Sequence, residues 1–300
     1  MTQTVPTQLP AEWRDFFALT KPRVMSLVIF TGLCGLLAAP GTINPILGFT
    51  AVLCIALGAG GAAALNQWWE ADIDAGMKRT AARPLPAGRM NRTDARDFGV
   101  LIAAASVMIM GLALNWLAAA ILAFSVFYYA VIYTVWLKPR TPQNIVIGGI
   151  AGAIPPLLGW TAVTNELHPY AWLLVLIIFV WTPPHFWALA IHRADEYAKA
   201  DVPMLPVTHG IPFTRESVLY YTILLFICSL LPYLTGMSGL IYLVSAVILS
   251  GIFLVHAVRL RFSKDPKLPM KTFGYSIVYL FVLFTALLVD HYIPVHPGSF

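Results

Sequence analysis

The chain is poor in charge. Only 11% of its 300 residues are Asp, Glu, Lys or Arg, whereas 59% are hydrophobic, and the mean hydropathy is +0.75. Soluble globular proteins carry about 25% charged residues, so this composition excludes that class and indicates a protein that crosses a membrane several times. The basic residues that give the net charge of +5 lie in short segments between apolar runs. That placement argues against nucleic-acid binding and makes the charge a signal of membrane topology.

Cysteine and the common nucleotide-binding motifs are also scarce or missing. Cys34, Cys54 and Cys228 each lie inside an apolar run, and neither CxxC nor CxxCH occurs. The sequence therefore gives no support for a disulfide framework, a zinc ribbon or a covalently attached c-type haem. A Walker A motif and a GxGxxG sequence after a strand are absent, which argues against a nucleotide as the substrate.

What the chain does have is a series of apolar runs of membrane-spanning or nearly membrane-spanning length. The runs cover residues 24–39, 46–65, 98–114, 116–137, 145–163, 170–191, 219–235, 240–258 and 273–289. A transmembrane helix needs about 20 mostly apolar residues. We therefore expect an all-α membrane protein with about nine transmembrane helices around a central cavity. We expect one polytopic domain over residues 1–300, in which residues 1–20 form a cytoplasmic leader.

The basic residues predict how these helices are oriented. All 19 Lys and Arg residues lie before the first run or in the connections that follow the second, fourth, sixth and eighth runs. Such asymmetry is a positive-inside signal, so it places the N-terminus and two long charged loops, residues 66–96 and 192–216, in the cytoplasm. A faint repeat relates Leu85-Pro86 to Leu205-Pro206. It favours two four-helix units plus a ninth helix. The acidic loops of the two units would then cap a site in the central cavity.

The first charged loop opens with the stretch NQWWEADIDAGMKRTAARPLPAGR, residues 66–89. On a helix Asn66, Glu70 and Asp74 fall at i, i+4 and i+8 and form one stripe, from which Asp72 points away. Amide and carboxylate oxygens suit a hard divalent cation. Cations that suit phosphate oxygens follow directly: Lys78, Arg79 and Arg83. A loop that only solvates two helices would need no such register, so we interpret the stretch as a functional site.

The second charged loop contributes HFWALAIHRADEYAKADVPMLPV, residues 185–207. If the sixth helix continues inward, His185, His192 and Glu196 share one face, flanked by Asp195. A zinc site formed by His185, His192 and Glu196 is an alternative, but the i, i+7 spacing of the histidines is loose for two ligands. His185 follows two prolines inside an apolar run, where an ionisable side chain is costly and indicates a function.

The two acidic loops, predicted on the same side of the membrane, suggest one composite site. Carboxylates from both loops are suited to hold Mg²⁺, and basic side chains are suited to grip a diphosphate. An apolar tail would lie among the helices below. This arrangement favours a lipid diphosphate over a nucleotide as the substrate.

The same residues resemble the first motif of the UbiA-type intramembrane prenyltransferases. That motif has an Asn, acidic residues four and eight positions later, and a basic segment that ends here in Arg83-Pro84. Glu70 stands where most members have Asp, and the second loop lacks the usual clear repeat of aspartates. The stretches KRTAARPLPAGR and HFWALAIHRADEYAKADVPMLPVTHG resemble those of members that prenylate haem. The resemblance extends over essentially the whole chain.

This resemblance implies transfer of a farnesyl group from farnesyl diphosphate to a vinyl group of haem b, giving haem O, with Mg²⁺ as cofactor in a bacterial inner membrane. It implies the catalytic residues Asn66, Glu70, Asp74 and Asp195, which bind metal together with Glu196. It implies that diphosphate is held by Lys78, Arg79, Arg83 and Lys199, and haem by His185 and His192. Terminal-oxidase or haem A synthase assembly proteins are candidate partners.

Two other functions are left open by the sequence. One is a prenyltransferase of the same family that acts on an aromatic acceptor such as 4-hydroxybenzoate. The other is a membrane transporter, whose carboxylates would be expected within the spans rather than at their ends.

Overall fold

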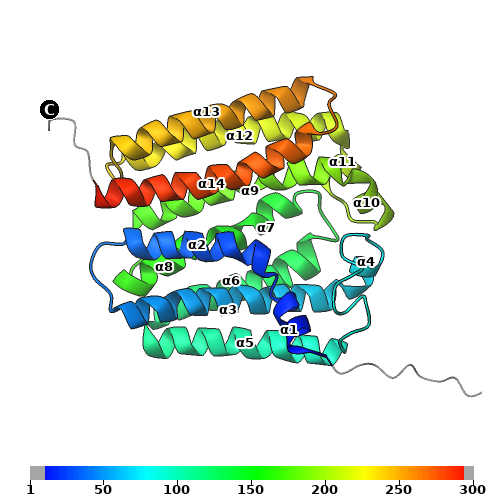
Figure 1. The fold of residues 1–300 in the computed structure, drawn as a ribbon, viewed down its shortest axis with the longest axis horizontal. Coiled ribbons are helices and arrows are strands. Elements are labelled where there is room, and N and C mark those ends of the chain that lie inside the picture. Colours follow the sequence, from blue (N-terminus) through cyan, green and yellow to red (C-terminus); the bar gives the residue numbers. More distant parts are fainter. Residues whose placement is uncertain (1–10, 294–300) are drawn as a thin grey trace, which may run out of the picture.

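The computed structural model describes residues 11–293, which form a bundle of long, roughly parallel and antiparallel helices (Figure 1) and contain no strand. The elements are α1 (Trp13–Leu19), α2 (Pro22–Ala38), α3 (Pro45–Trp69), α4 (Ala71–Ala75), α5 (Arg92–Ala113), α6 (Trp116–Phe127), the π-helix η1 (Tyr128–Leu137), α7 (Asn144–Ala153), α8 (Pro155–Thr164), α9 (Pro169–His192), α10 (Ala194–Lys199), α11 (Leu205–Thr208), α12 (Gly210–Leu234), α13 (Leu240–Phe262) and α14 (Leu268–Tyr292). The first ten residues of the expected leader lie outside the described part.

Eight helical segments in the described residues are long and apolar enough to cross a membrane. Two of them join elements, α6 with η1 and α7 with α8. The pair α1 and α2, bent by 55° between them, is a ninth candidate span. The prediction of an all-α membrane protein with about nine transmembrane helices is therefore confirmed. Many large apolar side chains on the outside of the bundle are exposed, such as Ile46 and Leu112, each at 74%, as expected for a surface that faces lipid.

Two of the spans begin at an asparagine whose side chain caps the helix. The Asn44 side chain accepts a hydrogen bond from the Ile46 N–H at 2.9 Å at the start of α3. The Asn115 side chain accepts one from the Ala118 N–H at 2.8 Å at the start of α6. Such caps satisfy backbone N–H groups that have no partner inside the helix. They place the turns at the ends of the spans.

Two main hydrophobic clusters divide the interior of the bundle. One joins residues of α3, α5, α6 and α8, and the other joins residues of α9, α12, α13 and α14. The helices α2 and α8 contribute to both clusters, through Leu36 and Leu158 in the first and Cys34 and Leu157 in the second. The ninth helix, α14, packs within the second cluster between α9 and α13. The division into two four-helix units stays a prediction.

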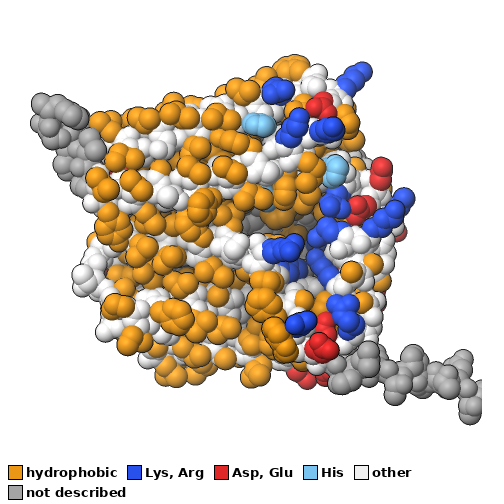
Figure 2. Space-filling view, viewed as in Figure 1, with side chains coloured by type: hydrophobic (Ala, Val, Ile, Leu, Met, Phe, Trp, Pro, Cys, Tyr) orange, Lys and Arg blue, Asp and Glu red, His pale blue; other side chains and the backbone are white. Residues whose placement is uncertain are grey.

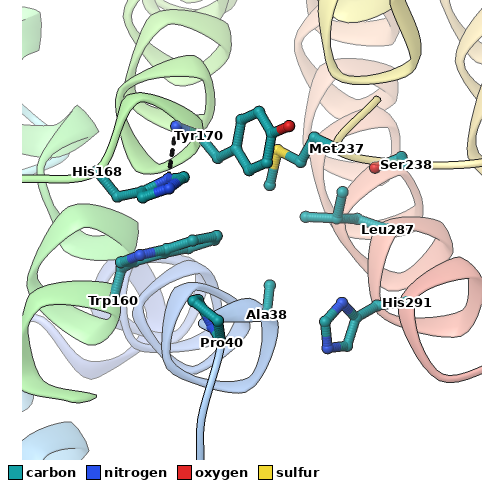
Figure 3. A pocket seen from close by; sticks show the side chains of 9 residues that line it. All are labelled: Ala38, Pro40, Trp160, His168, Tyr170, Met237, Ser238, Leu287 and His291. Carbon is teal, nitrogen blue, oxygen red and sulfur yellow. Dashed lines mark hydrogen bonds between the residues drawn. The ribbon is translucent and has the colours of Figure 1, made fainter. Parts of the chain in front are cut away.

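The two ends of the bundle differ in charge. Lys, Arg, Asp and Glu side chains gather at the end where α3 and α9 finish, whereas the sides are apolar (Figure 2). A cavity of about 290 Å³ lies at the other end and is lined by Ala38, Pro40, Trp160, His168, Tyr170, Met237, Ser238, Leu287 and His291 (Figure 3). Its lining contains no Lys, Arg, Asp or Glu, so it lacks the groups that a diphosphate needs. The candidate site is therefore at the charged end.

Candidate functional site

The stripe predicted from the first charged loop is present at the end of α3. The helix α3 ends at Trp69 and α4 begins at Ala71, yet the hydrogen bonds from Glu70 N to Asn66 O (3.0 Å) and from Asp74 N to Glu70 O (2.8 Å) continue the helical register across the junction. Asn66, Glu70 and Asp74 are only 2%, 3% and 4% exposed. Asp72 points outward, as predicted, and pairs with Arg92 at 2.7 Å.

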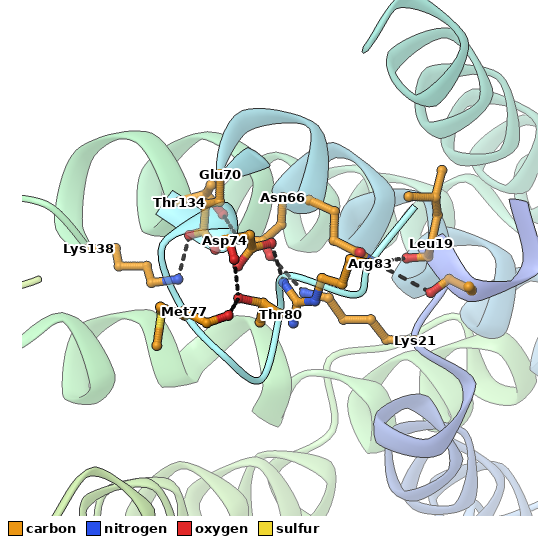
Figure 4. A network of polar contacts seen from close by, with 12 residues as sticks. Leu19, Lys21, Asn66, Glu70, Asp74, Met77, Thr80, Arg83, Thr134 and Lys138 are labelled. Carbon is orange, nitrogen blue, oxygen red and sulfur yellow. Dashed lines mark hydrogen bonds and ion pairs between the residues drawn. The ribbon is translucent and has the colours of Figure 1, made fainter. Parts of the chain in front are cut away.

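Each side chain of this stripe contacts a basic side chain (Figure 4). Lys21 Nζ donates to Asn66 Oδ1 at 2.7 Å, and Lys138 Nζ donates to Glu70 Oε1 at 2.6 Å. Arg83 forms an ion pair with Asp74. Because buried carboxylates are costly without a counter-charge, the two ion pairs account for the burial of Glu70 and Asp74. We call Asn66, Glu70, Asp74, Lys21, Arg83 and Lys138 the polar cluster.

The π-helix η1 positions one side of the polar cluster. In its i→i+5 pattern, Lys138 N donates to Tyr133 O at 2.9 Å, and the Thr134 hydroxyl donates to Tyr129 O at 2.8 Å. Thr134 and Lys138, four residues apart, both face the stripe. Thr134 Oγ1 accepts a hydrogen bond from Asn66 Nδ2 at 3.0 Å, and Lys138 contacts Glu70.

The loop after α4 brings Arg83 back to the stripe. The Thr80 hydroxyl donates to the Asp74 carbonyl at 2.7 Å and is fully buried, so it closes a turn there. Arg83 faces Asp74 as a result, whereas Lys78 and Arg79, on the outside of the turn, are exposed. Of the three predicted diphosphate residues in this loop, Arg83 alone contacts the stripe.

Glu70 also controls the ionisation of its partner. Burial lowers the pKa of Lys138, but the charge of the Glu70 carboxylate and the hydrogen bond to it outweigh that effect. The pKa of Lys138 consequently lies above its usual value, and the ammonium keeps its proton at neutral pH. The Glu70–Lys138 contact is therefore an ion pair.

The second charged loop folds into α10 and α11 at the same end of the bundle (Figure 1). Glu196 Oε1 accepts from Arg193 Nη1 at 2.8 Å, whereas Asp195, Lys199 and His192 are exposed. His185 is buried within α9. The structure thus separates the predicted second-loop residues into one ion-paired glutamate, three exposed side chains and one buried histidine.

Both charged loops contribute to one hydrophobic cluster. Ile73, between Asp72 and Asp74 in α4, packs against this cluster, to which Val202, Met204 and Leu205 of the second loop also belong. The loops therefore cap the bundle together. Within residues 11–293, however, no group of three or more His, Cys, Asp and Glu side chains is placed to hold a metal ion. The five predicted metal residues do not form one ligand cage here, and neither do the three residues of the alternative zinc site.

Sequence reasoning missed two members of the polar cluster, Lys21 and Lys138, and also Thr134, which accepts a hydrogen bond from Asn66. Each lies at or near the end of an apolar run that faces the charged loops. That position is the only signal in the sequence for a role in the site. It is ambiguous for the lysines, because basic residues at the cytoplasmic ends of spans are expected from membrane topology alone.

The geometry defines an integral membrane protein with a buried polar cluster at one end of a helical bundle, and comparison with known proteins agrees. The family model of the UbiA prenyltransferase family matches residues 27–288. The fold is similar to a solved digeranylgeranylglyceryl phosphate synthase, with a TM-score of 0.77 at 17% identity, covering 93% of this chain and 98% of that one. A UbiA homologue from Archaeoglobus fulgidus bound to GPP and Mg²⁺ aligns with a TM-score of 0.63 at 14% identity, covering 91% of this chain and 99% of that one.

Sequence relatives are much closer. A protoheme IX farnesyltransferase from Alcanivorax borkumensis is 66% identical over 290 residues, 96% of each chain. One of the same name from Erythrobacter litoralis is 63% identical over 297 residues, 97% of each chain. The chain therefore belongs to the UbiA prenyltransferase family and is an enzyme of the prenyltransferase class. It is a multi-pass membrane protein.

Proposed function

We propose that the protein transfers the farnesyl group of farnesyl diphosphate to a vinyl group of haem b. The allylic C–O bond breaks as diphosphate leaves, and the vinyl group forms a bond to the farnesyl carbon. Water then adds to the resulting cation and loses a proton, which gives the hydroxyethylfarnesyl group of haem O. The observation that carries the transfer chemistry is the polar cluster, where two buried carboxylates and three cations meet at the end of an apolar bundle. The acceptor is inferred from the relatives named protoheme IX farnesyltransferase.

The polar cluster fits Mg²⁺ and a diphosphate together. Mg²⁺ is commonly bound through one or two carboxylates plus phosphate oxygens of the substrate rather than by a cage made wholly of protein. Glu70 and Asp74 supply two carboxylates on one helical stripe, and Asn66 supplies an amide oxygen. When bound, Mg²⁺ would neutralise the charge that builds up on the departing diphosphate. The solved A. fulgidus homologue with GPP and Mg²⁺ supports this choice of metal.

The cations of the polar cluster have a second role in this proposal. Lys21, Arg83 and Lys138 now neutralise or hydrogen-bond the stripe. With Asn66, Glu70 and Asp74 holding Mg²⁺, these side chains would be free to donate to diphosphate oxygens. Lys78, Arg79 and Lys199, which are exposed in the two charged loops, would supply further positive charge. Such donors would stabilise the negative charge that develops on the diphosphate in the transition state.

By the orientation proposed from the basic residues, this end of the bundle lies on the cytoplasmic side of a bacterial inner membrane. Terminal-oxidase and haem A synthase assembly proteins stay predicted partners. In the membrane, the farnesyl chain and the porphyrin would both reach the site from the apolar phase.

The test supplies purified protein with labelled farnesyl diphosphate, Mg²⁺, and either haem b or 4-hydroxybenzoate. We expect label in a more hydrophobic haem species whose mass corresponds to haem O, together with release of diphosphate. Label in 4-hydroxybenzoate alone would assign the chain to the rival acceptor. Absence of diphosphate release with either acceptor would contradict a prenyltransferase.

A further inference from the structure

The environment of His185 is unlike that of a histidine at a membrane surface. It lies in α9 directly after Pro183 and Pro184 and is 7% exposed. Its ring is stacked between Trp181, with centroids 4.2 Å apart and planes at 19°, and Phe273 of α14, at 4.5 Å and 26°. The aromatic rings on both faces hold the plane of the imidazole in one orientation.

Ser276 of α14 determines which ring nitrogen carries the proton. Its Oγ lies 2.6 Å from the Phe273 carbonyl oxygen and 2.6 Å from His185 Nδ1. Two oxygens this close need a proton between them, and a serine hydroxyl has only one to give. The hydroxyl therefore donates to the carbonyl, and His185 Nδ1–H donates to the hydroxyl oxygen.

The second nitrogen of His185, Nε2, consequently carries a lone pair in the neutral ring. Among the described residues Nε2 has no hydrogen-bond partner, and it is not completely enclosed by protein atoms. The carbonyl of Ser276 also accepts from Trp181 Nε1 at 2.8 Å, so one residue anchors both the imidazole and the indole that covers it.

This combination is the one that histidine metal ligands show. A ligating imidazole is neutral, binds through one nitrogen, and donates its other N–H to a partner that fixes the ring. A histidine that served only to fill the interior would be expected to use both nitrogens in hydrogen bonds. A metal ion alone has no set of ligands here, because no group of three or more His, Cys, Asp and Glu side chains suited to a metal occurs in the described residues. The partner must therefore bring a metal that already has its other ligands.

We propose that His185 Nε2 binds the iron of a haem as an axial ligand, which orients the porphyrin for the transfer. This inference rests on the proposed function, which supplies haem as the acceptor. His185 lies seven residues before His192, where α9 ends, so the iron would sit about 10 Å along the helix from the charged end of the bundle. That depth is among the apolar side chains, where a porphyrin is better solvated than in water.

The test titrates haem b and metal-free protoporphyrin IX into the purified full-length chain, without farnesyl diphosphate, for the wild type, His185→Ala, Ser276→Ala and His256→Ala. His256 is the control histidine: it lies in α13, is partly buried, and stacks on Tyr275 with centroids 4.9 Å apart. We expect the wild type and His256→Ala to show the absorption and resonance Raman signature of histidine-ligated haem. His185→Ala should lose that signature and bind haem at least tenfold more weakly, and free imidazole should restore it. Ser276→Ala should keep the signature with affinity lowered about 10- to 100-fold, as for other partners that orient a ligand.

Protoporphyrin IX separates ligation from structure, because it has no iron to bind. Its affinity should be the same for the wild type and His185→Ala; an equal loss for both porphyrins would overturn the inference and make His185 structural. Haem O formation by the wild type together with an unchanged haem spectrum in His185→Ala would overturn the inference and leave the proposed function standing. A wild type that binds no haem would contradict the proposed acceptor itself.

Discussion

Lys138 and Glu70, 68 residues apart in the chain, form an ion pair in which Lys138 Nζ lies 2.6 Å from Glu70 Oε1. The Glu70 side chain is 4% exposed and the Lys138 side chain 20%. The pair connects the end of η1 to the end of α3, so it holds two spans together at the polar cluster. In the absence of a divalent cation, the ammonium supplies the positive charge that the buried carboxylate requires.

We predict that Lys138→Met destabilises the protein by about 3 kcal/mol in Mg²⁺-free buffer, because it leaves the Glu70 carboxylate buried without a partner. Mg²⁺ should recover part of this loss by binding to the folded state. Thermal unfolding in detergent, with and without Mg²⁺, measures both effects. Arg140→Met is the control, because it removes an exposed cation nearby that forms no ion pair within the described residues. Equal losses in the two variants would contradict the role given to Lys138.

The close crossing of α2 and α8 predicts a specific intolerance. A Cβ at Gly159 would lie 2.0 Å from the Gly32 carbonyl oxygen and 2.6 Å from Leu36 N, whereas one at Gly152, in the same span, meets nothing within 4 Å. Gly159→Ala should therefore cost at least about 3 kcal/mol, since backbone atoms have to move apart. Gly152→Ala should be neutral or slightly stabilising. Comparable thermal unfolding of the two variants would show that the crossing is looser than described.

Asp290 is predicted to be structural. It lies in α14 at the end opposite the polar cluster, is 3% exposed, and accepts hydrogen bonds from the N–H groups of Gly239, Ile241 (3.0 Å) and Tyr242 (3.3 Å) at the start of α13. Asp290→Ala should lower the free energy of unfolding by about 1–3 kcal/mol, because it leaves these donors without an acceptor. Asp290→Asn, which keeps an acceptor oxygen, should cost less. Loss of farnesyl transfer at unchanged stability would instead place Asp290 in the function.

The proposed orientation predicts a labelling pattern. Cys34, Cys54 and Cys228 are buried and reduced, so a new surface thiol can be labelled selectively. Asn91→Cys, at the charged end, should react with an impermeant maleimide only after the membrane is opened, whereas Glu166→Cys, at the other end, should react on intact cells. Both positions are exposed. The reverse pattern would place the charged loops outside the cell.

The acidic stripe could be predicted from the sequence, but most of its partners could not. Helical periodicity places Asn66, Glu70 and Asp74 on one face, and backbone hydrogen bonds preserve that periodicity through the α3–α4 junction. Thr134 and Lys138 are four residues apart, so a helix places them on one side. Nothing in YYAVIYTVWL, however, marks that side as the one that meets Asn66 and Glu70.

The basic residues of the loop show a second limit. Lys78, Arg79 and Arg83 are alike in the sequence, and the Thr80 turn decides that only Arg83 faces Asp74. His185 is the converse case. Its position inside an apolar run pointed to a function, but its tautomer depends on Ser276, which is 91 residues away and is not marked by any motif.

The most direct test of the account is the Mg²⁺ dependence of farnesyl transfer in Glu70→Gln. This change keeps the size of the side chain but removes the charge proposed to hold the metal. We predict a rate lower by about 10²–10³-fold, the cost of losing one comparable electrostatic group, and a higher Mg²⁺ concentration for half-maximal rate. Glu70→Asp, which keeps the charge, should be much milder. A normal rate and normal Mg²⁺ dependence in Glu70→Gln, with Asp74→Asn equally unaffected, would contradict the claim that this stripe carries the reaction.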